Sequence, residues 1–340
     1  MDMHLPPLRY LSAEEIVACL PSVEERLHLA ELTLVALADG SAELPAKIAI
    51  HPRGPSSFGH AMPAHLRGMD PNGGDDLVGM KWVVGHPGNG APGGPGLPAI
   101  FATIVINDPM TGFPVAILDG GPITAARTAA VSGVAIRRFA PELGAAATRG
   151  HRVGLIGAGV QGRSHLEVVG HVLPGAHLQV FDRDHARAES LASAARSTPG
   201  IATAHVAPGA REAVLDADVV VTVASFGPVH QVMTNDWLQP DALVVPVDYA
   251  TYCAAEVAHD AGLFLVDEIG QFLANREAGL FDDYPDPTTS LGAAILDGVE
   301  RPASGRIVAT HLGTGLADLV FGRAIVRAAE AAGRGTIIPR

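Results

Sequence analysis

Hydrophobic and polar residues follow two different periods along this chain, and the first third combines helices with alternating strands. Helices are expected within residues 12–39, because Ser12 and Glu15 have the spacing of a capping box and Gly40 ends the second periodic segment. Strand-like segments separated by turn-rich loops follow at 47–52, 79–85, 100–108 and 113–120. This pattern indicates a mostly antiparallel sheet with leading helices.

A regular alternation of strands and helices begins after a long helix that is expected over 124–140. Short apolar runs then alternate with amphipathic segments as far as the run LFLVD at 263–267. Strands that alternate with helices form a parallel, doubly wound sheet. The last segment, 315–333, is expected to form an amphipathic helix that returns to the first domain, with an apolar face made by Leu316, Leu319, Val320 and Ile325.

Three glycines between an apolar strand and a helix point to a cofactor. Gly157, Gly159 and Gly162 form G-x-G-x-x-G directly after the run 153–156. The first glycine allows a tight turn, the second lets the backbone approach a pyrophosphate, and the third lets helix and strand pack closely. Free N–H groups at the helix start suit the phosphates. We therefore expect a Rossmann dinucleotide-binding domain in the second half.

The acidic residue after the next strand indicates which dinucleotide binds. Asp182 lies twenty positions beyond Gly162, where a carboxylate accepts hydrogen bonds from the ribose hydroxyls of NAD. Arg183 follows directly and would suit the 2′-phosphate of NADP. The sequence favours NAD and leaves NADP open.

Charge and composition exclude several classes of function. Asp and Glu total 36 against 23 Lys and Arg, and the resulting net charge of −13 disfavours binding to nucleic acid or to anionic membrane surfaces. Two cysteines, Cys19 and Cys253, are too few for a disulfide framework. The first residues lack a signal-peptide pattern, and no apolar run approaches the ~18 residues of a membrane span. We expect a soluble cytoplasmic protein.

Lysine is nearly absent from the chain. Of the 23 basic residues, two are lysines, Lys47 and Lys81, and the others are arginines. A chain with this bias would keep lysine where a compact ammonium on a flexible stem is required, although retention by chance is the alternative. Trp82 follows Lys81 in a predicted strand, so it is expected to face the opposite side and to pack in a core.

Arg127 is a second candidate for binding an anion. It follows Thr124, a plausible N-cap of the helix expected over 124–140. Arg127 and the helix N-terminus would then share one anion, such as a substrate carboxylate, and a solvated arginine is the alternative.

Other kinds of site are not indicated. Four histidines gather in one region but lack the ligand spacing that metal sites show with Cys or carboxylates: His51, His60, His65 and His86. We therefore expect no metal. No G-x-S-x-G motif is present, so a serine hydrolase is not supported.

Three stretches of the sequence resemble the ornithine cyclodeaminase/mu-crystallin family: GMKWVVGHPGN, TGFPVAILDGGPITAARTAAVSGVA and GLIGAGVQG. The similarity covers roughly residues 40–265, with a weaker match in HLGTGLADLVFGRAI. It implies a homodimer in which an N-terminal α/β domain, completed by the C-terminal tail, binds substrate and forms the dimer interface. The expected division is 1–125 with 311–340 for that domain and 126–310 for the Rossmann domain that binds NAD(H) or NADP(H).

The resemblance also implies roles for individual residues. Lys81 and Arg127 match two family residues that hold the substrate carboxylate beneath the nicotinamide, and Lys47 stands where the family has an arginine. Asp248, after an apolar strand, matches the acid/base carboxylate, but the glycine-rich continuation of the family is missing. The proposed catalytic residues are therefore Lys81 and Asp248. The proposed substrate-binding residues are Lys47, His60, Met62, Lys81 and Arg127.

His60 stands where ornithine cyclodeaminases have a glutamate that pairs with the substrate's side-chain ammonium. An imidazole cannot replace that carboxylate. The expected function is therefore an NAD(P)-dependent amino-acid dehydrogenase or ketimine/imino-acid reductase that transfers hydride at the α-carbon. The alternatives are a true ornithine or lysine cyclodeaminase and a non-catalytic, NAD(P)H-dependent small-molecule binding protein.

The expected cofactor-binding residues combine the glycine motif and the two residues after the next strand with positions outside the motif. They are Thr128, Gly157, Ala158, Gly159, Val160, Gln161, Gly162, Asp182, Arg183, Thr222 and Ser225. Ser225 is among them because it follows the fourth Rossmann strand, where loops line the cofactor crevice.

Overall fold

The computed structural model describes residues 6–53, 57–68, 75–90, 93–143, 149–225 and 230–339. The chain forms two compact units. The first unit comprises 1–127 with 313–340, and the second comprises 128–312. Parts of the two turn-rich loops expected from the sequence, 69–74 and 91–92, lie outside the described residues. The expected division had set the boundaries at 125/126 and 310/311.

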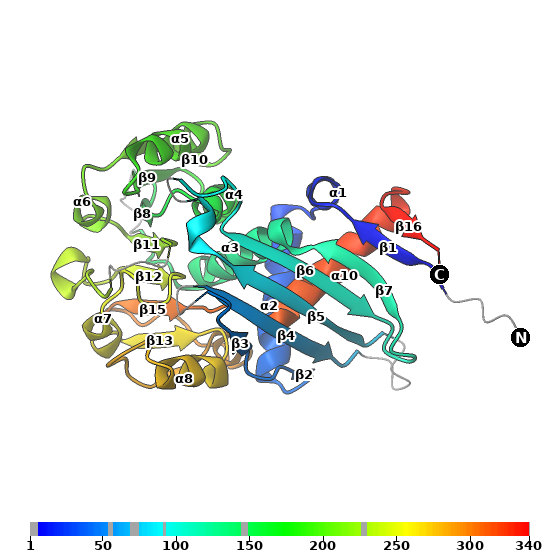
Figure 1. The fold of residues 1–340 in the computed structure, drawn as a ribbon. Helices are drawn as coiled ribbons and strands as arrows, with labels where there is room; N and C mark the ends of the chain where they lie inside the picture. Colours follow the sequence, from blue (N-terminus) through cyan, green and yellow to red (C-terminus); the bar gives the residue numbers. More distant parts are fainter. Residues whose placement is uncertain are drawn as a thin grey trace, which may run out of the picture. The chain divides into compact units, whose positions relative to one another are not determined.

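The first unit contains a mostly antiparallel sheet with helices on one face (Figure 1). Its strands, in spatial order, are β16 (Thr336–Ile338), β1 (Leu8–Leu11), β7 (Pro114–Asp119), β6 (Ile100–Asn107), β5 (Leu77–Gly85), β4 (Phe58–Leu66) and β2 (Ala42–Glu43). The short strand β3 (Ile48–Ile50) also pairs with β4. The helices are α1 (Ala13–Ala18), α2 (Val23–Ala38) and α10 (Gly315–Ala331), and a 3-10 turn covers Pro87–Gly90.

Helix α10 returns to the first unit, as the pattern predicted. It packs there on β4, β5, β6 and α2. The capping box at Ser12 and Glu15 is confirmed, because each side chain bonds the backbone N–H of the other residue. Helix α2 ends before Gly40, which has φ +79°, a left-handed conformation that glycine adopts without steric cost.

Strand β4 was not predicted. It has nine residues, pairs along its whole length with β5, and contains Pro63 at its centre. Proline cannot donate to a sheet ladder, so its presence argued against a strand. The other edge of β4 pairs with β3 at 59–61 and with β2 at 65–66. Pro63 therefore falls in the gap between these two short neighbours.

The second unit confirms the doubly wound α/β fold, because every strand pairing in its sheet is parallel. In spatial order the strands are β10 (Ile201–Val206), β9 (Ala176–Phe181), β8 (Arg152–Ile156), β11 (Val219–Thr222), β12 (Leu243–Pro246), β15 (Ile307–Thr310), β13 (Leu263–Val266) and β14 (Thr289–Ser290). Strand β15 was not predicted and lies between β12 and β13.

Short helices and one long helix complete the second unit. They are α4 (Val160–Val172), α5 (His185–Arg196), α6 (Ala210–Val214), α7 (Ala255–His259), α8 (Ile269–Glu277) and α9 (Leu291–Leu296), with a 3-10 turn at Asn235–Trp237. The long helix, α3 (Gly120–Phe139), includes the division between the units. In the part of the chain that the structure describes, no helix is both long and apolar enough to cross a bilayer.

Candidate functional site

The glycine motif forms a tight turn between β8 and α4 in the second unit. Gly157 has φ +111°, and a Cβ atom there would lie 2.7 Å from the carbonyl oxygen of Val223. A Cβ on Gly162 would lie 2.1 Å from the carbonyl oxygen of Gly157. Both positions therefore require glycine, the first for its conformation and the second for the close approach of α4 to the turn.

The N-terminus of α4 is open to a ligand. Gly159 is its N-cap, no side chain caps the helix there, and a Cβ on Gly159 would meet no atom within 4 Å. Val160, the first helical residue, is exposed, whereas Ala158 before the cap is buried. Uncapped N–H groups at a helix start bind phosphate oxygens well, and the macrodipole adds to this preference. Gln161 continues the same first turn.

Asp182 follows β9 and is hydrogen-bonded to the glycine turn. Its Oδ2 accepts from the backbone N–H of Ala158 at 2.7 Å, and its Oδ1 accepts from that of Asp184 at 2.9 Å. The half-buried carboxylate therefore lies beside the turn, where a ribose would be recognised. Arg183, the next residue, is exposed.

Asp248 follows β12 at the carboxyl edge of the same sheet and is 2% exposed. Burial raises the pKa of its carboxyl group to about 6, and the Thr222 hydroxyl and nearby backbone groups oppose this shift only in part. Neither oxygen makes a hydrogen bond of normal geometry with a described residue. A carboxyl group with a pKa near neutrality can both take and give a proton.

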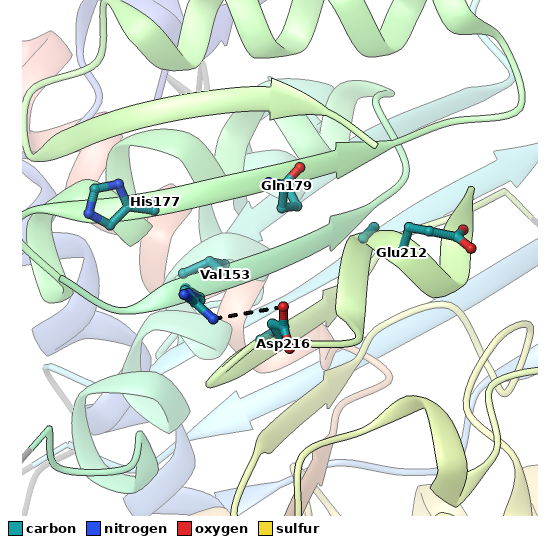
Figure 2. Close-up of a pocket in the computed structure, with 8 residues that line it drawn as sticks. Val153, His177, Gln179, Glu212 and Asp216 are labelled. Atoms are coloured by element: carbon teal, nitrogen blue, oxygen red, sulfur yellow. Dashed lines mark ion pairs between the residues drawn. The ribbon is translucent and has the colours of Figure 1, made fainter. Parts of the chain in front are cut away.

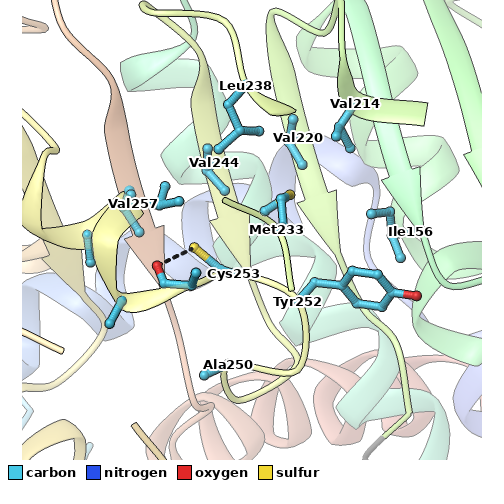
Figure 3. Packing of buried hydrophobic residues seen from close by; sticks show 14 of the residues in the cluster. Ile156, Val214, Val220, Met233, Leu238, Val244, Ala250, Tyr252, Cys253 and Val257 are labelled. Carbon is cyan, nitrogen blue, oxygen red and sulfur yellow. Dashed lines mark hydrogen bonds between the residues drawn. The ribbon is translucent and has the colours of Figure 1, made fainter. Parts of the chain in front are cut away.

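The turn after Asp248 is strained. Tyr249 and Ala250 have φ values of +52° and +60°, a conformation that costs a non-glycine residue about 1–3 kcal/mol. Glycine would adopt it at lower cost. The following residues anchor the turn in the core, where Ala250, Tyr252 and Cys253 are buried among apolar side chains (Figure 3). The core therefore holds the strained turn in place, and with it the carboxyl group of Asp248.

The remaining expected cofactor contacts, Thr222, Ser225 and Thr128, lie at or near the end of β11 and inside α3. Thr222 is the last residue of β11 and is fully buried, and Ser225 is exposed three residues later. Thr128 lies inside α3 and is buried. Thr222 and Ser225 thus follow the carboxyl end of the strand beside β8, the edge at which doubly wound sheets bind ligands.

A buried hydrogen-bond chain braces the first turn of α4. The Nδ1 of His165 donates to the carbonyl oxygen of Gln161 at 2.7 Å, so its Nε2 is left as an acceptor in a neutral ring. Burial lowers the pKa of His165 to about 4, which keeps the ring neutral. The Ser132 hydroxyl donates to that Nε2 at 2.8 Å and accepts from the Nε2 of His311 at 2.8 Å. These hydrogen bonds link α3, α4 and the end of β15.

Ser132→Ala is expected to destabilise the protein by about 2–6 kcal/mol, because each of the two buried imidazoles loses a hydrogen bond worth ~1–3 kcal/mol. Urea denaturation measures the change. The control is Ser190→Ala, which removes an exposed hydroxyl bonded to Arg163 and should change stability by less than ~0.5 kcal/mol. Equal stability of the two variants would show that the buried chain does not contribute.

The first unit buries two cations around one carboxylate. The Nζ of Lys81, on β5, lies 2.5 Å from Oδ2 of Asp318, and the Nε of Arg127 lies 3.2 Å from Oδ1. Lys81 is 1% exposed, Arg127 5% and Asp318 0%. The contact between Lys81 and Oδ2 of Asp318 acts through charge, since it lies outside hydrogen-bond geometry. Burial lowers the pKa of Lys81 to about 7, although Asp318 opposes this shift.

Glycines let α10 come close enough for this cluster. Gly313 has φ +74°, and a Cβ there would lie 2.0 Å from Nη1 of Arg127. A Cβ on Gly315 would lie 2.4 Å from the carbonyl oxygen of Met62. The helix that carries Asp318 therefore begins directly against the strand and the guanidinium.

His60 and Met62 share the inner face of the sheet with Lys81, and Lys47 interacts electrostatically with both His60 and Lys81. Met62 is paired with Lys81 in register, and His60 lies two residues earlier on β4. Lys47 precedes β3, whose Ala49 is paired with His60. Burial, assisted by the charges of Lys47, His51 and Lys81, lowers the pKa of His60 to about 4. The half-buried ring is therefore neutral and stacks on Phe58 at 4.6 Å.

Two expectations for this region are wrong. Helix α3 begins at Gly120, so Thr124 is not its N-cap and Arg127 lies in the third turn, away from the helix N-terminus. Arg127 instead pairs with Asp318. Trp82 does face the side opposite Lys81, but it is 37% exposed because no helix of the first unit covers that face.

Asp318 was not predicted as a site residue. The segment containing it was interpreted as an amphipathic helix, and that part is correct. The available indication was an aspartate between apolar residues in GLADLVFG, since such a residue on a buried helix face needs cationic partners.

A separate surface pocket lies at the opposite edge of the second unit's sheet (Figure 2). It encloses about 250 Å³ near the start of β8, and Arg152 and Asp216 form an ion pair of 3.8 Å at its rim. None of the residues proposed from the sequence lines it. Within the described ranges, no group of three or more His, Cys, Asp or Glu side chains is arranged to hold a metal ion.

Comparison with known proteins places the chain in a family. The model of the ornithine cyclodeaminase/mu-crystallin family matches residues 10–263. The chain belongs to this family. This chain is 31% identical over 341 residues to the nodulation efficiency protein NfeD of Rhizobium meliloti. The match covers 98% of this chain and 99% of that protein.

One relative and one structural neighbour have named activities. The family member is 27% identical over 236 residues to the ketimine reductase mu-crystallin of Mus musculus, which covers 68% of each chain. The fold of the present chain is similar to that of the Thermococcus litoralis Δ1-pyrroline-2-carboxylate reductase in complex with NADH and L-proline. The TM-score is 0.80 at 24% identity, covering 97% of this chain and 99% of that chain.

Proposed function

We propose that this chain is an NAD-dependent oxidoreductase that acts on a small amino or imino acid by hydride transfer at the α-carbon. The observation that carries the proposal is made within one sheet. Its carboxyl edge holds both a glycine turn suited to a dinucleotide and a buried carboxyl group, Asp248, with a pKa near neutrality.

The fit to a dinucleotide rests on the geometry of the turn. The uncapped start of α4 suits the pyrophosphate, and the Asp182 carboxylate beside it suits the ribose hydroxyls, which favours NAD over NADP. Arg183 is the residue that would accommodate NADP. The nicotinamide supplies hydride transfer when the cofactor is bound. The Thermococcus litoralis relative, solved with NADH and L-proline, supports this choice.

The buried cations suit the carboxylate of the substrate. Lys81 and Arg127 together carry two positive charges against the single charge of Asp318, and Lys47 adds a cation that interacts electrostatically with Lys81. Ammonium and guanidinium groups hold a carboxylate by charge-assisted hydrogen bonds. Fixing that end of the substrate orients its α-carbon, which is the main requirement for hydride transfer. Met62 would form an apolar wall next to Lys81.

Asp248 would move the proton. In the oxidative direction its carboxylate takes a proton from the substrate amine as the imine forms, and in the reductive direction the carboxylic acid returns it. The strained, anchored turn at Tyr249 and Ala250 fixes where that group lies.

His60 directs the choice among reactions. Its lowered pKa keeps it neutral, so it offers no charge to pair with a side-chain ammonium. This favours an amino-acid dehydrogenase or a ketimine/imino-acid reductase over an ornithine cyclodeaminase. The mouse relative, a ketimine reductase, supports the reductive form.

The proposal is tested by a panel of substrates with the purified chain. NADH oxidation is expected with pyruvate plus an amine, with cyclic ketimines or with iminosuccinate, and little NAD reduction is expected with ornithine. Faster turnover with NADPH would overturn the choice of cofactor. Formation of proline from ornithine would establish a cyclodeaminase, and ligand binding without any turnover would establish a binding protein.

We also propose that the chain forms a homodimer through the outer face of the first unit's sheet. This face is apolar and exposed: Ile50 is in line with Val84 and Phe101, and Ile48 is in line with Trp82. The Trp82 ring lies over Gly59. An apolar surface of this kind is usually covered by a partner.

Trp82→Lys is expected to convert the dimer to a monomer, because burying the introduced ammonium in the interface costs several kcal/mol. Light scattering coupled to size exclusion measures the mass. The control, Val17→Lys, places the same charge on an exposed position of α1 and should leave the dimer intact. A dimeric Trp82→Lys variant would place the interface elsewhere.

A further inference from the structure

We propose that Asp318 is a positioning residue that sets the charge of the substrate site, so that the site accepts one carboxylate group and couples its binding to protonation of Lys81. The proposal deepens the proposed function and rests on it. Asp318 lies beyond residues 10–263, the range that matches the family model.

The geometry gives Asp318 two cationic partners and a fixed position. One carboxylate oxygen approaches Lys81 and the other approaches Arg127, at 2.5 and 3.2 Å. Asp318 lies in the first turn of α10, whose N-cap Thr314 bonds the backbone N–H of Ala317. A carboxylate in the first turn of a helix interacts favourably with the helix dipole.

The charges do not cancel within the cluster. While Lys81 is protonated, Lys81 and Arg127 contribute two positive charges and Asp318 one negative charge, which leaves one positive charge in a buried place. An uncompensated buried charge is unfavourable. One bound carboxylate removes it, whereas a second carboxylate at the same place would leave an excess of negative charge. A neutral residue at 318 would leave two positive charges.

The surroundings make Lys81 the group that responds. Asp318 raises the pKa of Lys81, while burial, Arg127 and Lys47 lower it, and the outcome is a pKa of about 7. His60, on the neighbouring strand, also interacts with Lys81, and its ring is neutral above about pH 4. The Thr124 hydroxyl lies 3.5 Å from Nζ and adds no charge. A bound carboxylate adds a second anion and therefore raises this pKa further.

A purely structural role for Asp318, joining α10 to the sheet, makes different predictions. Losing a structural contact destabilises the protein whether or not Lys81 is present. If charge is what matters, removing Lys81 and Asp318 together is less harmful than removing Asp318 alone, because the pair carries opposite charges.

The chain offers a direct measurement, since Lys47 and Lys81 are its only lysines. Biosynthetic labelling with [6-¹³C]lysine gives two NMR signals, and Lys47→Arg assigns them. Lys81 is expected to titrate near pH 7, and in Asp318→Asn at least about one pH unit lower, because its neighbouring anion is lost. Acetate, the simplest monocarboxylate, should move the wild-type midpoint upwards. The control is Asp218→Asn, which breaks an ion pair with Arg149 in the other unit and should leave the midpoint unchanged.

A titration of Lys81 near pH 10, or no shift in Asp318→Asn, would overturn the proposal. Should Asp318→Asn fold poorly, thermal denaturation of the double variant Lys81→Met/Asp318→Asn decides. A melting temperature above that of the single variant supports the role of charge, and one at or below it supports the structural role. These measurements need neither cofactor nor turnover, so their outcome is separate from the fate of the proposed function.

Discussion

Asp248→Asn is expected to lower kcat/KM for amino-acid oxidation by about 10²–10⁴-fold, the usual contribution of general acid/base catalysis. The amide has nearly the same shape as the carboxyl group but cannot accept the proton at neutral pH. Because Asp248 belongs to the sheet edge and not to the glycine turn, the affinity for NADH should change little. Steady-state kinetics and fluorescence titration with NADH measure the two effects.

The matched control for this substitution is Asp216→Asn, at the pocket on the opposite edge of the same sheet. It removes an exposed carboxylate and should leave both constants unchanged. If Asp248→Asn retained wild-type turnover, proton transfer would have to be assigned to another group. If it lost NADH binding as well, its role would be structural.

Lys81→Met is expected to weaken binding of the substrate carboxylate by about 10²-fold, since a charge-assisted hydrogen bond contributes ~1.5–3 kcal/mol. In the wild-type protein only the ammonium form of Lys81 binds a carboxylate well. As the pH rises above about 7, this form is lost and kcat/KM for oxidation should fall by about tenfold per pH unit. As the pH falls below about 6, Asp248 becomes protonated and kcat/KM for oxidation should decrease on this side as well.

The variant separates these two limbs of the pH profile. Lys81→Met should abolish the decrease above pH 7 and retain the decrease below pH 6. The control is Lys47→Met, which removes the other lysine and should keep the basic limb. A basic limb that persists in Lys81→Met would belong to a different group.

The sequence was sufficient for the features that depend on local chemistry. The capping box at Ser12, the G-x-G-x-x-G turn and the alternation of strands and helices each involve residues close in the chain, where steric and hydrogen-bonding requirements are specific. For the same reason the amphipathic helix 315–331 was recognised, together with its return to the first unit.

Features that depend on partners distant in the chain were missed. Pro63 made β4 look unlike a strand, and only the gap between β2 and β3 explains why proline is tolerated there. Strand β15 was missed because its place between β12 and β13 is set by pairing. Asp318 was overlooked because its two partners precede it by more than 190 residues, which no local pattern reveals.

The same separation governs the order in which the protein can be made. At ~5–20 residues per second, roughly 10–40 seconds of synthesis pass between Arg127 and Asp318, which are 191 residues apart. During that time the whole of the second unit is synthesised, whereas the first unit still lacks α10. Its two cations have no carboxylate to enclose until that helix emerges. The nascent chain therefore contains every residue proposed to bind the cofactor well before the last charged residue of its proposed substrate site is made.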